Sequence, residues 1–206
     1  MELHAGEIAV IMGPSGCGKT TLLNCLSGID QVTEGVIQFA GMESSRMSER
    51  QRDAFRAANT GFIFQLYNLV PVLSAAENVE LPLLCSGVKP KLARERALEA
   101  LTRVGLRERE HHRPSELSSG QQQRVALARA IVNRPKIIFA DEPTGALDSR
   151  TNEMVMDLIE HLNRTEQISF IIVTHNPDVA RYAHRTFYMD SGQLISERQS
   201  GRRGRT

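Results

Sequence analysis

The sequence of 206 residues has few cysteines and no long apolar run, so it lacks the features of disulfide-rich, zinc-binding and membrane-spanning proteins. Its three cysteines, Cys17, Cys25 and Cys85, are an odd number without metal-ligand spacing, so we expect neither a disulfide framework nor a zinc site. A reducing cytosol fits this pattern. No apolar run approaches the roughly 20 residues that span a bilayer, and the start MELHAGE lacks the apolar segment of a signal peptide. Any role at a membrane is therefore expected to depend on a partner protein.

The sequence also has little net charge. Its 25 Lys and Arg stand against 24 Asp and Glu, which gives +1 and argues against a nucleic-acid partner. The exception is the basic end RQSGRRGRT, residues 198–206, which we interpret as a disordered tail. With 41% hydrophobic and 24% charged residues, the composition is that of an ordinary globular protein, and we predict one domain over 1–206.

Four short apolar runs predict buried strands: EIAVIM, GFIF, KIIFA and ISFIIV. They are rich in Ile, Val and Phe without alternation, as in strands that are covered on both faces of a parallel sheet. Helical stretches lie between them, so we predict the α/β class with right-handed crossovers and a core formed by 1–65 and 134–197. The span of about 66–133 contains no such run. Its stretches AAENVELPLL and LARERALEALTRVGL predict helices, and therefore an inserted helical subdomain.

The stretch GPSGCGKT, Gly13 to Thr20, has the pattern G-x-x-x-x-G-K-[ST] between a predicted strand and a predicted helix. Glycines let backbone N–H groups surround phosphate oxygens, and the helix directs its positive end at them. A purely structural turn is the alternative, which this setting disfavours. We predict a RecA-like P-loop NTPase core, in which Lys19 contacts the β- and γ-phosphates and Thr20 binds Mg²⁺. The residues expected to bind ATP are Gly13, Pro14, Ser15, Gly16, Cys17, Gly18, Lys19, Thr20 and Thr21.

Cys17 lies inside this loop and allows two interpretations. The neighbouring N–H groups and helix N-terminus favour a thiolate that reacts faster than Cys25 and is protected by Mg-ATP. Alternatively, the Cys17 side chain is buried and inert.

The stretch KIIFADEPTGALDS supplies carboxylates at the end of a predicted strand. Asp141 suits Mg²⁺, directly or through water, and Glu142 is expected to hold the attacking water as general base. His175 follows ISFIIVT and is expected at the same sheet edge, where it would contact the γ-phosphate. The predicted catalytic residues are thus Glu142, His175 and Lys19. A merely solvated turn is the alternative for the carboxylate pair.

The stretch ELSSGQQQRVALARAIV predicts a helix that begins after Ser118, which forms a capping box with Gln121. Its N-terminus is also a second potential anion site. One chain would then have two half-sites for one nucleotide.

LSSGQQQR resembles the signature motif of ABC-transporter ATPases, usually LSGGQ. The order P-loop, Gln65, signature, Asp141–Glu142, GALD and His175 is also that family's, from Glu7 to about Glu197. The resemblance implies that two subunits pack head-to-tail, each signature covering the other's ATP. It assigns Ser118, Ser119, Gly120, Gln121 and Asp148 to this interface. It also assigns Thr20, Gln65 and Asp141 to the metal, with Gln65 leading to the membrane partner. Ser119 departs from the usual glycine.

GFIFQLYNLVPVLSAAENVELPL and the region after the signature resemble the lipoprotein-releasing and macrolide-export group. The resemblance implies a Mg-dependent ATPase, working as a homodimer or with a related ATPase, that drives a separate transmembrane permease. It would lie in the cytoplasm on the inner face of the bacterial plasma membrane. LYNLVPVL would form the groove for the permease, or else pack into the helical subdomain. The alternatives in function are an ATP-switch subunit without transport and a weakly active truncated subunit.

Members of this family have a further segment before the position of Glu7, which forms antiparallel strands and carries an aromatic residue that stacks on adenine. This sequence has no tryptophan, and no tyrosine or phenylalanine precedes Phe39. We therefore expect an N-terminally shortened chain with those strands largely missing and ATP affinity lower by roughly 5- to 150-fold. GVIQFAG, Gly35 to Gly41, would then form an exposed strand edge.

Overall fold

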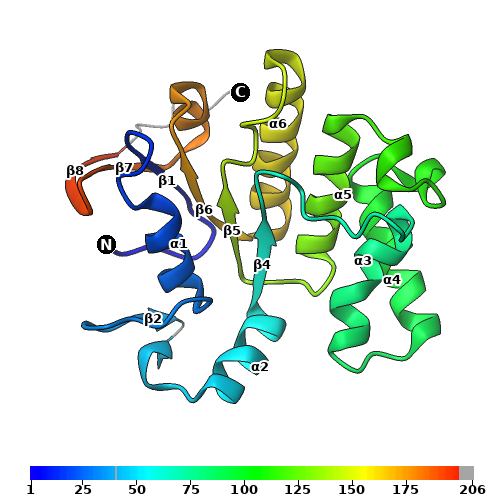
Figure 1. Cartoon of the computed structure of the whole chain (residues 1–206), viewed down its shortest axis with the longest axis horizontal. Helices are drawn as coiled ribbons and strands as arrows, with labels where there is room; N and C mark the ends of the chain where they lie inside the picture. Colours follow the sequence, from blue (N-terminus) through cyan, green and yellow to red (C-terminus); the bar gives the residue numbers. More distant parts are fainter. Residues whose placement is uncertain (40, 200–206) are drawn as a thin grey trace.

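The computed structural model describes residues 1–39 and 41–199. Its centre is a six-stranded sheet in the order β4-β5-β6-β1-β7-β8 (Figure 1). The strands are β1 (Ile8–Met12), β4 (Thr60–Ile63), β5 (Ile137–Asp141), β6 (Ser169–Thr174), β7 (Arg185–Asp190) and β8 (Gln193–Gln199). All neighbours pair in parallel except β7 and β8. The four strands predicted from apolar runs are confirmed as β1, β4, β5 and β6, and the α/β class with a mostly parallel sheet is confirmed with them.

These strands form because both of their faces are covered. In β1, Ile8 and Val10 belong to one buried cluster, whereas Ala9 and Ile11 belong to a second. The first cluster includes side chains of four helices, α3 (Ala75–Cys85), α4 (Pro90–Arg103), α5 (Ser119–Ile131) and α6 (Ser149–Glu166). The second lies on the side of α1 (Lys19–Ser27). Alternate residues of a strand point to opposite faces, so a strand between two layers is apolar throughout.

A group of helices packs together beside the sheet, as the span 66–133 predicts (Figure 1). It contains α3, α4 (Pro90–Arg103) and α5, with the short 3-10 turns η2 (Arg107–Arg109) and η3 (Pro114–Glu116). Pro90 is the first residue of α4, where its missing N–H costs nothing. Because α5 packs against both α3 and β4, it connects the helical group to the core.

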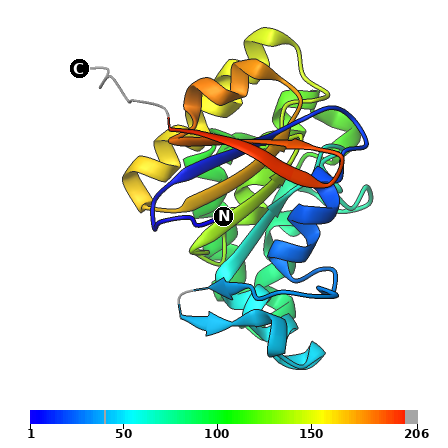
Figure 2. The ribbon, with the colours of Figure 1, turned by 90° about the vertical axis from the view of Figure 1, so that its left-hand side faces the viewer.

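GVIQFAG was expected to form a strand, and the structure places the short strand β2 (Gln38–Phe39) there, next to elements that the sequence did not predict. A two-stranded sheet of β2 (Gln38–Phe39) and β3 (Met42–Glu43) leads through η1 (Ser44–Arg46) into α2 (Glu49–Asn59), and Figure 2 shows these elements below the main sheet. Of the described residues of GVIQFAG, two are strand, Gln38 and Phe39, and they pair with Glu43 and Met42. The 3-10 turn η4 (Pro177–Tyr182) precedes β7.

Strand β8 corrects the predicted start of the basic tail. Arg198 and Gln199 pair with Thr186 and Arg185 of β7, so the first two residues assigned to the tail are strand. The remaining residues, 200–206, lie outside the described part of the chain. Within the described ranges, no helix has the length and apolarity that a membrane span needs.

Candidate functional site

Three neighbouring strands end at one edge of the sheet and bring together segments that are far apart in the sequence. Met12 at the end of β1 is in register with Thr174 of β6, and Asp141 at the end of β5 is in register with Val173. The loop that starts at Gly13 and the residues after Asp141 and Thr174 therefore emerge side by side. The carboxyl ends of parallel strands are where α/β proteins bind their ligands.

The phosphate loop folds as its glycines require. Gly16 and Gly18 have φ of 79° and 101°, in the left-handed region that side chains disfavour. A Cβ added at Gly13 would lie closer than 3.0 Å to the Met189 carbonyl of β7, so the loop lies tightly against the sheet. Helix α1 begins at Lys19, and no side chain caps it. Its first N–H groups and its positive end are thus directed into the loop.

Lys19 supplies a positive charge inside this loop. Its Nζ donates to the carbonyls of Gly13 at 2.8 Å and Pro14 at 2.9 Å, and the residue is only 8% exposed. An ammonium held this way is positioned for phosphate oxygens that the loop would surround.

Thr20 and Asp141 form a pair of oxygen donors next to Lys19. The Thr20 hydroxyl donates to both oxygens of the Asp141 carboxylate, at 3.2 Å and 3.1 Å. Burial raises the pKa of Asp141, the hydrogen bond from Thr20 opposes the shift, and Glu142 adds to it. A half-buried carboxylate beside a hydroxyl is a set of ligands that Mg²⁺ takes from a protein while it keeps water and phosphate as its other ligands, so these residues fit the ion.

Glu142 is held in an unusual backbone conformation at the end of β5. Its φ is 45°, and non-glycine residues in this region often lie at functional sites. One carboxylate oxygen, Oε1, lies 2.6 Å from Nδ1 of His175 and 3.0 Å from its backbone N. The hydroxyl of Thr174 donates to the other, Oε2, at 2.8 Å. The sequence predicted Glu142 and His175 at one edge, and the structure places them in direct contact.

Gln65 and the loop after it reach this edge from β4. Strand β4 pairs with β5, and a Cβ added at Gly145, in the turn after Glu142, would lie 3.3 Å from Nε2 of Gln65. Burial raises the pKa of Tyr67, two residues further on, and a side-chain hydrogen bond with Ser119 acts against that shift. Ser119, which departs from the usual signature, thus faces the loop after Gln65.

The signature stretch caps α5 and packs tightly on α6. Ser118 accepts from the N–H of Gln121 at 3.3 Å, and Oε1 of Gln121 accepts from the N–H of Ser118 at 2.9 Å, which is the predicted capping box. A Cβ at Gly120 would lie closer than 3.0 Å to Cγ2 of Thr151 in the first turn of α6. Asp148 caps α6 through the N–H and hydroxyl of Thr151, at 3.0 Å and 2.7 Å.

Figure 1 shows the start of α5 well separated from α1 and its phosphate loop, with β5 between them. The structure therefore does not bring Ser118–Gln121 to the Lys19 site of the same chain.

Sequence reasoning missed three contributors to the site and left one question open. Thr174 was predicted only as a strand residue, yet its hydroxyl donates to Glu142. Thr151 could have been predicted as the N3 partner of the N-cap residue Asp148. The fully buried Gln123 donates to the carbonyl of Pro143, and no local sequence pattern predicts this contact. Cys17 is 7% exposed and belongs to the buried cluster on the α1 side. Burial favours the inert interpretation of Cys17 over the reactive one.

The chain is similar to many known proteins. A family model described as ABC transporter matches residues 1–145. The lipoprotein-releasing system ATP-binding protein LolD of Coxiella burnetii is 48% identical over 193 residues, which are 93% of this chain and 83% of that protein. The macrolide export ATP-binding/permease protein MacB of Marinobacter nauticus is 44% identical over 96% of this chain, but the match spans only 30% of that protein.

The fold has an equally clear counterpart among solved structures. The ATP-binding cassette MJ0796 of Methanocaldococcus jannaschii, solved as a dimer in a post-hydrolysis state bound to ADP and Pi, superposes with a TM-score of 0.88. It is 41% identical, and the match covers 97% of this chain and 88% of that one. The chain therefore belongs to the ABC transporter family, as an ATP-binding subunit with the ATPase fold.

Proposed function

We propose that this chain hydrolyses Mg-ATP at sites shared by two subunits and so drives a separate membrane protein of the lipoprotein-releasing or macrolide-export type. The observation that carries the proposal is the Glu142 carboxylate, which is held beside the Thr20–Asp141 pair at the end of three strands. A general base, two oxygen ligands for a metal ion and a phosphate-binding loop at the same edge of the sheet form the arrangement that phosphoryl transfer to water needs.

Glu142 is positioned to accept a proton from water. An ionised carboxylate has about four acceptor positions. With the imidazole proton on Nδ1, His175 fills two at Oε1 and Thr174 fills one at Oε2. The remaining position on Oε2 can hold the attacking water in line with the γ-phosphate and take its proton. His175 acts in this scheme by orienting the carboxylate, and its side chain is 60% exposed towards the sheet edge, where it can also meet phosphate.

Lys19 and the loop N–H groups would bind the β- and γ-phosphates, and their charge would stabilise the transferring group. Thr20 and Asp141 are the residues that would hold Mg²⁺, with Gln65 close to the adjoining turn. When bound, the ion neutralises phosphate charge. The raised pKa of Asp141 fits this role, because partial burial disfavours the charged form of this carboxylate and a bound cation would stabilise that form.

A second copy would complete each site. The N-terminal turn of α5 offers N–H groups and a favourable dipole, yet α5 lies away from α1 in the same chain (Figure 1). The relative MJ0796 is described as a dimer with ADP and Pi. A head-to-tail pair would bring Ser118–Gln121 of one subunit to the phosphate loop of the other, with Asp148 nearby through its contact with Thr151.

The face proposed for the membrane partner lies around the loop after Gln65. Leu66 and Val72 are 74% and 71% exposed, and a groove of about 380 Å³ adjoins this loop, lined by Phe62, Phe64 and other residues. Exposed apolar side chains next to a groove are typical of a protein-binding surface. The partner would be a permease, and the chain would then act in the cytoplasm at the inner face of the plasma membrane.

Hydrolysis by the isolated chain tests the shared site. If each site needs two chains, the rate per chain rises with chain concentration until the dimer saturates, and chelation of Mg²⁺ by EDTA abolishes it. A rate per chain that is constant down to nanomolar concentrations would contradict the shared site.

The proposed partner surface needs its own test. Val72→Glu should leave hydrolysis by the isolated chain unchanged and abolish co-purification with the co-expressed permease. Leu92→Glu, at the 41% exposed Leu92 of α4, is the matched control and should retain the permease. Retention of the permease by Val72→Glu would exclude this face.

A further inference from the structure

The hairpin of β7 and β8 turns against the phosphate loop. Asp190 pairs with Gln193, so Ser191 and Gly192 alone form the turn. Their φ angles of 46° and 81° are both positive, as in the tight type I′ turn that joins two strands. The N–H of Gly192 donates to the carbonyl of Cys17 inside the phosphate loop at 2.9 Å. Figure 2 shows this turn next to the start of α1.

Met189, next to the last residue of β7, contacts both ends of the same loop. Strands β1 and β7 are in register up to the residues just before Gly13 and Met189, so these two residues lie side by side. The Met189 carbonyl occupies the space that a Cβ of Gly13 would need, and its Cε lies 3.2 Å from where a Cβ of Gly18 would be. Met189 is 5% exposed and belongs to the same buried cluster as Cys17. The loop is therefore held by one buried residue and one turn of the hairpin.

A register shift in the hairpin lies at this point of contact. Tyr188 pairs with Ser196, whereas Met189 pairs with Leu194, so Ile195 is an extra residue on β8. A β-bulge of this kind bends its strand and changes the direction of neighbouring side chains, and bulges are frequent next to active sites. The bulge thus lies at the residue of β7 that contacts the phosphate loop.

Several carbonyls of the phosphate loop are bound by other parts of the fold. Those of Gly13 and Pro14 accept from Lys19, and that of Cys17 accepts from Gly192. A loop that binds anions must direct its N–H groups at the ligand, and bonds to its carbonyls on the other side keep it in that orientation. The hairpin supplies one of these bonds from outside the loop.

We propose that Met189 and the turn of Ser191 and Gly192 are positioning residues, which hold the phosphate loop in the conformation that binds ATP. A loop that is already ordered loses less entropy when the nucleotide binds. Without the hairpin contact, only a fraction of the molecules has a binding-competent loop, and the apparent affinity falls by that fraction. The inference rests on the proposed function, because it takes the phosphate loop as the site that binds ATP.

Labelling of Cys17 with maleimide under native conditions reports on this support without nucleotide. Cys17 is 7% exposed, whereas Cys85 is exposed at the end of α3. The reagent reaches Cys17 only when the loop opens locally, so the ratio of the labelling rates at Cys17 and Cys85 measures that opening. Peptide mapping separates the two sites, and the KM and kcat of hydrolysis give an independent readout.

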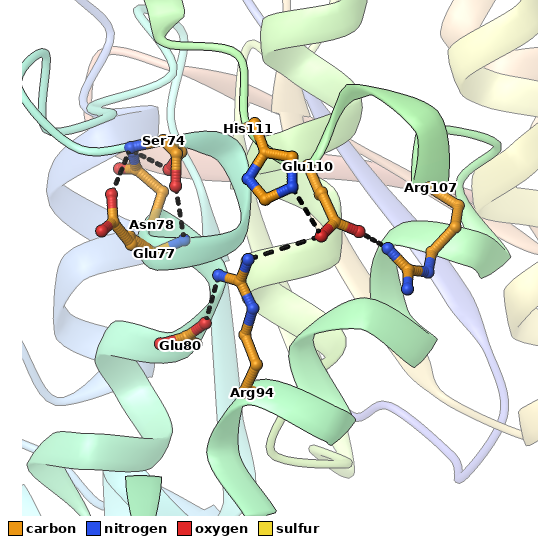
Figure 3. Close-up of polar contacts among 8 residues, drawn as sticks. All are labelled: Ser74, Glu77, Asn78, Glu80, Arg94, Arg107, Glu110 and His111. Carbon is orange, nitrogen blue, oxygen red and sulfur yellow. Dashed lines mark hydrogen bonds and ion pairs between the residues drawn. The ribbon is translucent and has the colours of Figure 1, made fainter. Parts of the chain in front are cut away.

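Gly192→Ala weakens the turn through backbone strain alone. A Cβ at Gly192 would have no neighbour within 4 Å among the described residues, but the φ of 81° is unfavourable for alanine. We expect Cys17 to be labelled about 5- to 30-fold faster, the range for a left-handed residue with a Cβ. The matched control is Gly87→Ala, with a φ of 79° and equally open surroundings. Gly87 lies between α3 and α4, which the ion pair of Glu80 and Arg94 joins (Figure 3), and its change should leave Cys17 labelling unaltered.

Met189→Ala removes the side chain beside Gly18 and tests the effect on ATP. We expect Cys17 labelling to be at least about 30-fold faster, the range for a large-to-small change at a buried position. The KM for Mg-ATP should rise about 10-fold while kcat changes little, because saturating nucleotide restores the loop. Met156→Ala is the matched control, since Met156 of α6 is fully buried in the other cluster, and it should change neither KM nor labelling. Met189→Leu conserves the volume and should restore both values.

Equal Cys17 labelling in the two glycine variants, or a KM that the two alanine variants of methionine share, would overturn the inference. If Met189→Ala does not fold, the comparison of the glycine variants decides alone. Hydrolysis that persists in Lys19→Ala would instead refute the phosphate loop as the ATP site, and with it the proposed function. Labelling in the absence of nucleotide then still decides whether the hairpin holds the loop.

Discussion

Gly120 is the residue at which the packing of the signature helix can be tested most directly. A Cβ at this position would lie closer than 3.0 Å to Cγ2 of Thr151, a distance that real Cβ atoms essentially never show. The other atoms of Thr151 are more distant, with Cβ at 3.7 Å and Oγ1 at 3.8 Å. The conflict of Gly120→Ala is therefore with one methyl group on α6, and Thr151→Ser removes that methyl.

The size of the effect follows from two opposing terms. Extra volume in a packed contact costs about 1–3 kcal/mol, whereas alanine in place of glycine in a helix gains about 0.5–1 kcal/mol. We expect Gly120→Ala to destabilise the chain by about 0.5–2 kcal/mol, or about 2–4 °C in Tm for each kcal/mol in a protein of this size. In the Thr151→Ser background, the same change should be neutral or stabilising, because its nearest neighbour would then be at 3.7 Å.

Urea denaturation of the four chains that make up the double-mutant cycle gives the coupling energy directly. Thr151→Ser keeps the hydroxyl that donates to Asp148 at 2.7 Å, so the cap of α6 is retained. Thr165→Ser, further along α6, removes an equivalent methyl where the hydroxyl donates to His161 at 2.9 Å. It serves as the control and should show no coupling to Gly120→Ala. Equal destabilisation by Gly120→Ala with and without the Thr151→Ser change would refute the packing argument.

Three further predictions concern the nucleotide site. Glu142→Gln should leave ATP binding intact, lower hydrolysis by about 10²–10⁴, the range for losing a general base, and accumulate as a dimer with Mg-ATP in sizing chromatography. Asp141→Asn should raise the Tm of the nucleotide-free chain at neutral pH, because burial raises the Asp141 pKa in the folded state and its charge then opposes folding. Buried Cys17 should react with maleimide more slowly than half-buried Cys25, as peptide mapping after timed labelling can show.

The pH dependence of the Asp141 prediction has a defined sign. A carboxyl group whose pKa is raised in the folded state destabilises the fold as the pH rises from the ordinary pKa through the raised pKa. Below the ordinary pKa this penalty is absent. The gain from Asp141→Asn should therefore vanish in acid. A gain that is the same at all pH values would point to packing instead. For Glu142→Gln, a chain that remains monomeric at saturating Mg-ATP would contradict the shared site, and for Cys17, labelling as fast as at Cys25 would contradict its burial.

Much of the fold and part of the site could be predicted because the responsible signals are local. Apolar runs that are continuous predict doubly covered strands, and β1, β5 and β6 formed where such runs stand. The loop from Gly13 to Thr20 has glycines at the positions where φ is positive, Gly16 and Gly18. Ser118 and Gln121 form the capping box of α5 within one helical turn. Backbone sterics and neighbouring N–H groups decide such features, and both depend on only a few adjacent residues.

Weaker local patterns failed. Strands β7 and β8 were not predicted, and Arg198 was assigned to a tail because basic residues dominate that end. Its strand conformation depends on pairing with Thr186, which composition does not reveal.

Contacts between distant residues were decided only by the tertiary structure. His175 contacts Glu142 because β6 lies beside β5. The guanidinium of Arg129 donates to the carbonyls of Tyr67 and Asn68 because α5 packs against β4, the strand that leads into their loop. The sequence by itself determined the four doubly covered strands β1, β4, β5 and β6, the loop that can hold phosphate and the start of α5. The strand order and the packing of α5 then selected the partners of each side chain, since hydrogen bonds and methyl contacts depend on distances of a few ångströms that no local pattern specifies.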